Sequence, residues 1–196
     1  MPDIHVPELT ESEIAEIREQ SVAKLGICKK QNDIIGQQIF SILGLYARAL
    51  YYPLGEESVW GFTRIVGTNE RESAGKPFVA INSSIPIDCQ VFAAAHELYH
   101  IWFDEKAEIV PANVIDESAT DRNELKANRF AAEFLVDQDL LLKELKTYSI
   151  SLDSITIKDI LHLSALFTVP YRTMVKRLWE TGVYTKKERD QFLSKT

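Results

Sequence analysis

Two histidines and a glutamate in the segment His96-Glu97-Leu98-Tyr99-His100 are the residues of this chain best suited to chemistry. The segment lies in the apolar stretch Val91–Phe103, which predicts a buried helix. Residues four apart share one face of a helix, so His96 and His100 could bind one cation. Glu97 lies about 100° further round the helix, beside that cation, where a general base acting on water would lie. The alternative is a helix with two ordinary buried histidines.

A catalytic zinc site has three protein ligands and a water molecule, so one protein ligand remains to be found. Glu124, 24 residues after His100, could supply it from a second helix. A third histidine six residues after His100 is excluded because Lys106 stands there. Glu124 could instead be a first-turn acid favoured by the helix dipole. The third ligand would then be one of Asp104, Glu105, Asp116, Glu117, Asp121 and Glu133.

Asn128 follows Glu124 by one helical turn and therefore lies on the same face of the second helix. Its side chain could accept the spare ring N–H of a ligand histidine and so fix the tautomer of that ring. Asn128 is therefore a candidate for orienting a metal ligand rather than for binding the metal.

These two motifs resemble those of the ImmA/IrrE family of bacterial and phage metallopeptidases. In that family His-Glu-x-x-His is followed by Glu-x-x-Ala-Asn-x-Phe-Ala-Ala, which this chain matches at 124–132. The likeness extends from about residue 30 to about residue 183 and includes the closing helices at 163–182. Two positions depart from the family pattern: Tyr99 replaces glycine, and Leu135-Val136-Asp137 replaces Leu-Met-Pro. Neither departure touches a ligand, although Tyr99 could alter packing or substrate access near the site.

The resemblance implies an α+β, zincin-like metallopeptidase, mostly helical, with a small antiparallel or mixed sheet packed on a metal-binding helix pair. It implies one Zn²⁺ per chain on His96, His100 and Glu124, with Glu97 as the catalytic residue and Asn128 orienting a ligand. The implied activity is a zinc-dependent endopeptidase that cuts a helix-turn-helix repressor and so derepresses a mobile element or stress genes. This ligand set favours zinc, although manganese or iron could bind in vitro.

The expected chemistry is attack of an activated water on a peptide carbonyl. Glu97 would take a proton from the water and deliver it to the leaving nitrogen. A further hydrogen-bond donor is expected at the oxyanion. The sequence does not choose among four candidates for that donor: Tyr148, His162, Tyr171 and Arg172.

Apolar periodicity, capping signals and β-branched stretches predict the elements that position these residues. Helices are expected at about 10–26, 32–43, 87–103, 121–137, 140–146, 157–167, 171–180 and 186–193. Strands are expected at 48–53, 58–66 and 78–82, with a hairpin loop at 67–76 and an irregular connection at 105–118. If strand 78–82 forms the sheet edge over the cleft, an extended substrate could add to it.

Composition indicates an ordinary globular protein, with 45% hydrophobic and 26% charged residues. We expect an N-terminal helical segment at 1–30, a metallopeptidase core at 31–150 and a C-terminal helical segment at 151–196, packed as one unit. The net charge of -7 argues against nucleic acid as the main partner. The first twenty residues lack signal-peptide features, and no apolar run reaches membrane-spanning length. These features predict a cytoplasmic protein with a protein substrate, no membrane partner, and Cys28 and Cys89 as free thiols.

A second function class comes from the expected helices at 157–167 and 171–180, which are spaced like a helix-turn-helix. The second of them carries Arg172, Lys176 and Arg177, so the chain could be a DNA-binding regulator with a bound metal. A related alternative is a protein that binds its repressor without cutting it. The acidic composition and the glutamate beside the two histidines favour the peptidase.

Overall fold

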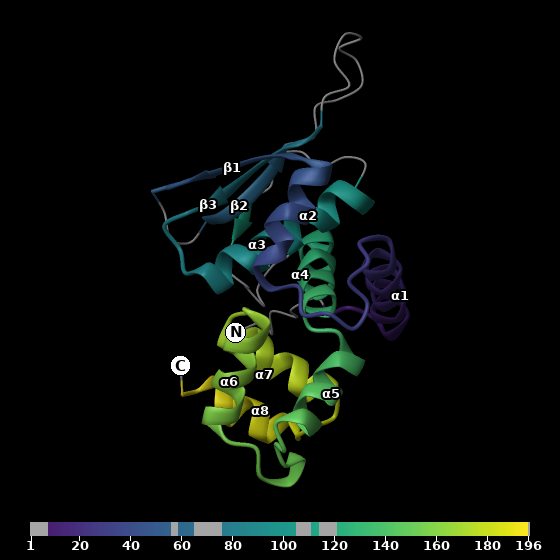
Figure 1. The fold of residues 1–196 in the computed structure, drawn as a ribbon, viewed down its shortest axis with the longest axis vertical. Helices are drawn as coiled ribbons and strands as arrows, with labels where there is room; N and C mark the ends of the chain where they lie inside the picture. Colours follow the sequence, from purple (N-terminus) through teal and green to yellow (C-terminus); the bar gives the residue numbers. More distant parts are fainter. Residues whose placement is uncertain (1–7, 56–58, 65–75, 105–110, 114–120, 196) are drawn as a thin grey trace, which may run out of the picture.

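The computed structural model describes residues 8–55, 59–64, 76–104, 111–113 and 121–195. These residues form an α+β structure in which a small sheet covers one side of a central pair of helices (Figure 1). The C-terminal helices gather at the opposite end of the molecule, and the first helix flanks the central pair.

The helices are α1 (Glu11–Ile27), α2 (Ile39–Tyr46), α3 (Ile87–Phe103), α4 (Arg122–Leu135), α5 (Gln138–Thr147), α6 (Ile157–Phe167), α7 (Tyr171–Glu180) and α8 (Lys186–Leu193). Short 3₁₀ turns occur at Gly36–Gln38 and Leu152–Ser154. The strands are β1 (Arg48–Tyr52), β2 (Val59–Arg64), β3 (Phe78–Asn82) and β4 (Pro111–Asn113). The expected mostly helical α+β class is confirmed, whereas the domain boundaries stay a prediction.

The sheet has the strand order β1-β3-β2-β4. Strand β3 pairs in parallel with β1 and antiparallel with β2, and β2 pairs antiparallel with β4. The expectation that Phe78–Asn82 forms an edge is therefore wrong. Its last four residues are all buried, as is typical of an interior strand covered on both sides. The edge beyond β2 is β4, which lies in the segment expected to be irregular.

Helix α2 also differs from the expected range of 32–43. Gly36 adopts a φ of +46°, a left-handed conformation that does not belong to an α-helix, so the helix begins only at Ile39. It continues past Gly44 to Tyr46, whose ring packs edge-on against that of Trp102 with centroids 5.2 Å apart.

Helix α3 is the most deeply buried element, since every residue from Val91 to His100 is buried. Helix α4 packs against it through Ala127, Phe130, Ala131 and Phe134, all at most 1% exposed. Each large apolar side chain that is fully buried contributes about 1.5–3 kcal/mol to folding. The site residues on α3 are therefore held in the most deeply buried helix, and α4 is anchored to it from Ala127 onward.

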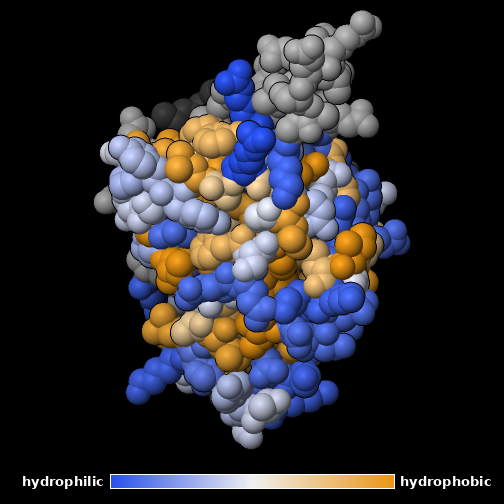
Figure 2. Space-filling view, turned by 45° about the horizontal axis from the view of Figure 1, so that its top comes forward, coloured by the Kyte–Doolittle hydropathy of each residue, from blue (hydrophilic) through white to orange (hydrophobic). Residues whose placement is uncertain are grey.

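Apolar side chains also reach the surface. Ile27, Leu45 and Tyr52 are each at least 60% exposed. The face drawn in Figure 2 carries a band of hydrophobic residues down its middle, with hydrophilic residues on both sides. Among the described helices, none is both long enough and apolar enough to cross a membrane.

Candidate metal centre

Helix α3 brings the two histidines together. His96 and His100 are one turn apart, and their Nε2 atoms lie 3.1 Å from each other. Both side chains are almost fully buried, at 2% and 4% exposure. Two ring nitrogens this close would share either one proton or one cation, which is the arrangement expected from the sequence.

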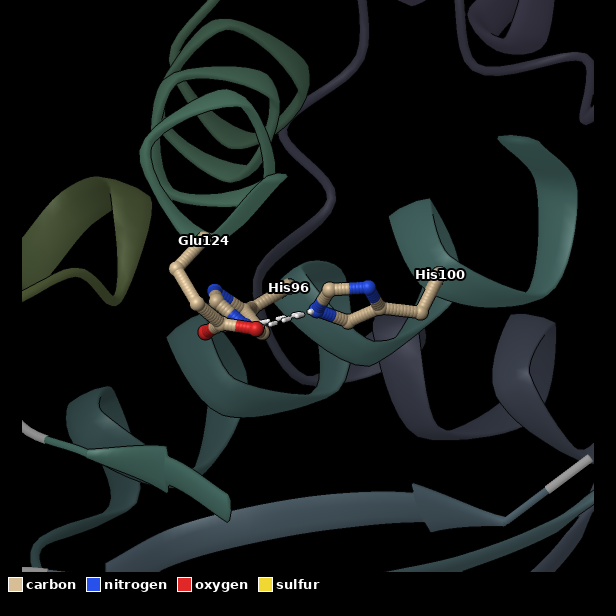
Figure 3. Close-up of side chains that lie close together, drawn as sticks. All are labelled: His96, His100 and Glu124. Atoms are coloured by element: carbon tan, nitrogen blue, oxygen red, sulfur yellow. Dashed lines mark hydrogen bonds and ion pairs between the residues drawn. The ribbon is translucent and has the colours of Figure 1, made fainter. Parts of the chain in front are cut away.

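Glu124 reaches the same point from the first turn of α4 (Figure 3). This helix begins at the cap residue Asp121, whose carboxylate accepts the backbone N–H of Asn123 at 2.8 Å. The Glu124 carboxylate places Oε2 3.1 Å from Nε2 of His96 and Oε1 3.3 Å from Nε2 of His100. The structure thus brings together the three residues predicted to be ligands.

The donor set fits a divalent metal ion such as zinc. Ligand atoms around a tetrahedral zinc with bonds of ~2.0–2.1 Å lie about 3.3 Å apart. The two imidazole Nε2 atoms, 3.1 Å apart, are close to that spacing, and each lies near one oxygen of the Glu124 carboxylate. With one ligand atom taken from each residue, the three atoms lie within 4.8 Å of one another. Among the described residues, His96, His100 and Glu124 form a group able to hold a metal ion. Two imidazoles and one carboxylate leave a coordination position open, as catalytic zinc sites do.

Both histidines have a partner on their other ring nitrogen. Nδ1 of His96 lies 2.9 Å from Oδ1 of Asn128, and Nδ1 of His100 lies 3.5 Å from Oδ2 of Asp104. An amide oxygen only accepts hydrogen bonds, so Nδ1 of His96 carries the proton and Nε2 presents its lone pair. Such partners orient ligand histidines and increase their basicity.

Glu97 is fully buried beside this group. Among the described residues, neither of its carboxylate oxygens makes a hydrogen bond of good geometry, although the hydroxyl of Thr63 is near enough to lower its pKa. Burial raises the pKa of Glu97 above its usual range, against the lowering effect of His96 and His100. A buried carboxylate without a hydrogen bond of good geometry is costly and rare in folded proteins, so its retention calls for an explanation. A base that must reach a water molecule in the site would provide one.

Strand β2 makes room for Glu97. A Cβ atom at Gly61 would lie 3.3 Å from Oε1 of Glu97 and 2.9 Å from the carbonyl oxygen of Ala80. Only glycine therefore allows β2 to pass this close to the carboxylate. The sequence analysis missed Gly61, although an isolated glycine inside a strand is a signal of close approach.

The charges in the site are coupled. Burial raises the pKa of Glu124, but the contacts of its carboxylate with His100 and His96 outweigh burial and lower the pKa to about 2. Burial lowers the pKa of His100, but contacts with Glu124 and Glu97 raise it overall. The carboxylate of Glu124 is thus strongly held in its ionised form, as a metal ligand must be.

The rival third ligands lie elsewhere or play other parts. Asp121 caps α4, and Asp104 faces the Nδ1 atom of His100 rather than Nε2. Glu133 pairs with Arg129 and Arg177. Three further candidates, Glu105, Asp116 and Glu117, lie outside the described residues.

The four candidates for the oxyanion donor belong to the C-terminal helices or their edges. The rings of Tyr148 and His162 pack together with centroids 4.4 Å apart, and the hydroxyl of Tyr171 donates to the carbonyl of Phe192 at 3.4 Å. Arg172 is exposed on α7. None of these contacts ties a candidate to the metal centre, so this donor stays unidentified.

Tyr99, the residue that departs from the family pattern, packs into the core. Its ring contacts those of Phe103 and Phe130, with centroids 5.3 and 5.6 Å away, and it is 6% exposed. Of the two expected effects of Tyr99, the structure therefore gives evidence for packing. The ring of His100 lies beside it, at 5.8 Å between centroids.

A mixed sheet packed on two helices that bring His-Glu-x-x-His and a glutamate together defines an α+β, zincin-like protein. The family model of the IrrE N-terminal-like domain of M78 peptidases matches residues 48–179, about two thirds of the chain. The chain belongs to this family, which confirms the resemblance found in the sequence and supports a metallopeptidase. Among curated proteins and solved structures, no significant match was found.

Proposed function

We propose that this protein is a zinc-dependent endopeptidase that cuts a helix-turn-helix repressor in the cytoplasm and thereby relieves repression. The observation that carries the proposal is the convergence of His96, His100 and Glu124 beside Glu97, a fully buried carboxylate that makes no hydrogen bond of good geometry among the described residues. A structural zinc site would have four protein ligands and no need of such a carboxylate. Family membership supports peptide-bond hydrolysis as the chemistry.

Different residues bind the metal, transfer the proton and orient the metal ligands in that reaction. His96, His100 and Glu124 would hold one Zn²⁺, which when bound supplies Lewis-acid polarisation of a carbonyl and acidifies water. Glu97 takes the proton from the attacking water and passes it to the leaving nitrogen. Asn128 and Asp104 keep the two imidazole rings in place.

The sheet offers a place for the substrate chain. Strand β4 pairs with β2, and no other strand in the described part of the chain pairs with its second edge. Gly61, where an added Cβ would lie 3.3 Å from Oε1 of Glu97, is the residue of β2 that pairs with Ala112 of β4. A substrate segment that adds to β4 as an extended strand would therefore lie one strand from the base. This replaces the expectation that the substrate adds to β3.

The proposal is tested by expressing the chain together with the repressor encoded nearest to it. Wild type and Glu97→Gln are compared by immunoblot and by intact mass, which locates the bond that is cut. Cleavage by wild type and none by Glu97→Gln is the expected result. A repressor that stays intact with fully zinc-loaded wild type would overturn the assignment of this substrate, and equal cleavage by both proteins would overturn the role of Glu97.

A further inference from the structure

The carboxylate of Glu13 joins the first turns of two helices. On its own helix, α1, it accepts hydrogen bonds from the backbone N–H and the hydroxyl of Thr10, both at 2.9 Å, and so completes a capping box. It also accepts hydrogen bonds from Nε and Nη2 of Arg122, on α4, at 2.7 and 2.5 Å. Nζ of Lys126 lies 3.6 Å from the same carboxylate.

The two basic residues flank the metal ligand on α4. Arg122 and Lys126 are one turn apart and share a face of the helix, whereas Glu124, two residues from each, points roughly the opposite way. A contact that holds Arg122 and Lys126 against α1 therefore turns Glu124 toward His96 and His100. The first turn of a helix is the part most prone to fraying, so a ligand there needs such support.

We infer that Glu13 is a positioning residue for the metal centre: its ion pair with Arg122 fixes the first turn of α4 and thereby the direction of the Glu124 carboxylate. Helix α1 lies before residue 48, where the family match begins. The inference thus makes an element outside the matched segment part of the metal site. It rests on the proposed function, because it takes Glu124 to be a ligand.

The geometry of the Glu13–Arg122 pair suits this task better than an ordinary surface ion pair. Isolated exposed pairs contribute little, because each side chain loses conformational freedom when it pairs. Here the fork of the guanidinium meets both oxygens of the carboxylate, a geometry that fixes direction. Glu13 is also held by the capping box and is only 16% exposed.

The test is the Zn²⁺ affinity of purified protein, measured by competition with a chromophoric chelator. Glu13→Gln keeps a residue able to form the capping box but removes the charge, and Arg122→Gln breaks the same pair from the other helix. We expect each to weaken Zn²⁺ binding about tenfold, the low end for residues that orient metal ligands. The double variant should be no weaker than either single variant, because all three lack the same pair.

Glu11→Gln is the matched control, since Glu11 is an exposed acid in the same first turn of α1. It should bind Zn²⁺ as wild type does. The absorption of cobalt(II)-loaded protein gives a second readout, which should change in the Glu13 and Arg122 variants and not in the control. Zn²⁺ affinities within twofold of wild type would overturn the inference, even if the metal-free variants melt earlier. Wild type that binds no metal would instead overturn the proposed function, and the inference with it.

Discussion

Asn128 accepts a hydrogen bond from His96 across the two helices of the site: Oδ1 lies 2.9 Å from Nδ1, opposite the Nε2 atom that faces Glu124. The contact fixes both the tautomer and the direction of the ring. Asn128→Ala should therefore weaken Zn²⁺ binding by roughly 10–100-fold.

Asn128→Asp is the informative companion to that variant. Aspartate keeps an acceptor oxygen at the same place, so binding should stay closer to wild type. Chelator competition on both proteins checks the pair. Equal losses in the two variants would show that the amide matters for packing and not for accepting the imidazole proton.

Glu97→Gln should separate metal binding from turnover. Zn²⁺ should still bind, because His96, His100 and Glu124 are unchanged. Turnover should fall by about 10²–10⁴, the usual contribution of a general base. The metal-free variant should also melt at a higher temperature, because a fully buried ionisable carboxylate is replaced by an uncharged amide of similar size. Loss of Zn²⁺ binding would contradict the first expectation, and a lower melting temperature of the metal-free variant would contradict the second.

Gly61→Ala tests how closely β2 must approach the base. The new Cβ would lie 2.9 Å from the carbonyl oxygen of Ala80 and 3.3 Å from Glu97 Oε1, so the strand and the carboxylate must move apart. We expect about 1–3 kcal/mol of destabilisation and a loss of turnover larger than the loss of Zn²⁺ affinity.

Gly44→Ala in α2 is the control for that variant, because an added Cβ there meets nothing within 4 Å. Alanine in place of a helical glycine should stabilise the protein by about 0.5–1 kcal/mol and leave turnover unchanged. Urea denaturation checks the expected stability changes of the two variants, and a cleavage assay checks their turnover. Normal turnover in Gly61→Ala would remove the proposed link between β2 and the base.

Each half of the candidate metal site was predictable from the sequence because the determinants of each half are local. His96, Glu97 and His100 sit within one helical turn, and Glu124 and Asn128 within another, so helix geometry fixes which side chains share a face. The sheet order was not predictable in the same way. Whether β3 lies inside or at the edge depends on its pairing with β1, a contact between residues about thirty positions apart that no local pattern encodes.

Separation along the chain also explains why only one of the two contacts of Glu13 was visible in the sequence. Its capping box with Thr10 is a local pattern and was visible in the sequence. Its pairing with Arg122 joins residues 109 positions apart and became visible only in the structure.

The stability contributed by Glu13 should depend on pH in a defined direction. The side chain of Arg122 holds the pKa of the Glu13 carboxyl at about 2, below its ordinary value of 4.5. A depressed pKa in the folded state means that the ionised form stabilises the fold above the unfolded value, and that this stability is lost as the pH falls through the folded value. Wild type should therefore exceed Glu13→Gln in unfolding free energy at neutral pH, with the difference shrinking from about pH 4.5 to about pH 2. A difference that stays constant in urea titrations at successively lower pH would contradict this.

The burial of Arg177 argues against the DNA-binding alternative at the second helix of the expected helix-turn-helix. Its side chain is 0% exposed. Its guanidinium pairs with Glu133 at 2.8 Å and Glu180 at 2.7 Å, and donates twice to the carbonyl of Val136. Removing one partner of such a buried pair leaves charges without compensation, so Arg177→Ala should cost about 3–5 kcal/mol. Arg172→Ala, at an exposed position on the same helix, should change stability by no more than about 0.5 kcal/mol.

The DNA-binding alternative needs the basic residues of α7 to reach phosphates, and a buried, paired guanidinium cannot do so. We therefore expect neither variant to change the retention of the protein on DNA at low salt, while Arg177→Ala alone shifts the urea midpoint. A salt-sensitive DNA affinity that Arg172→Ala abolishes would instead support the regulator, because the loss of one phosphate contact reduces the salt dependence of binding.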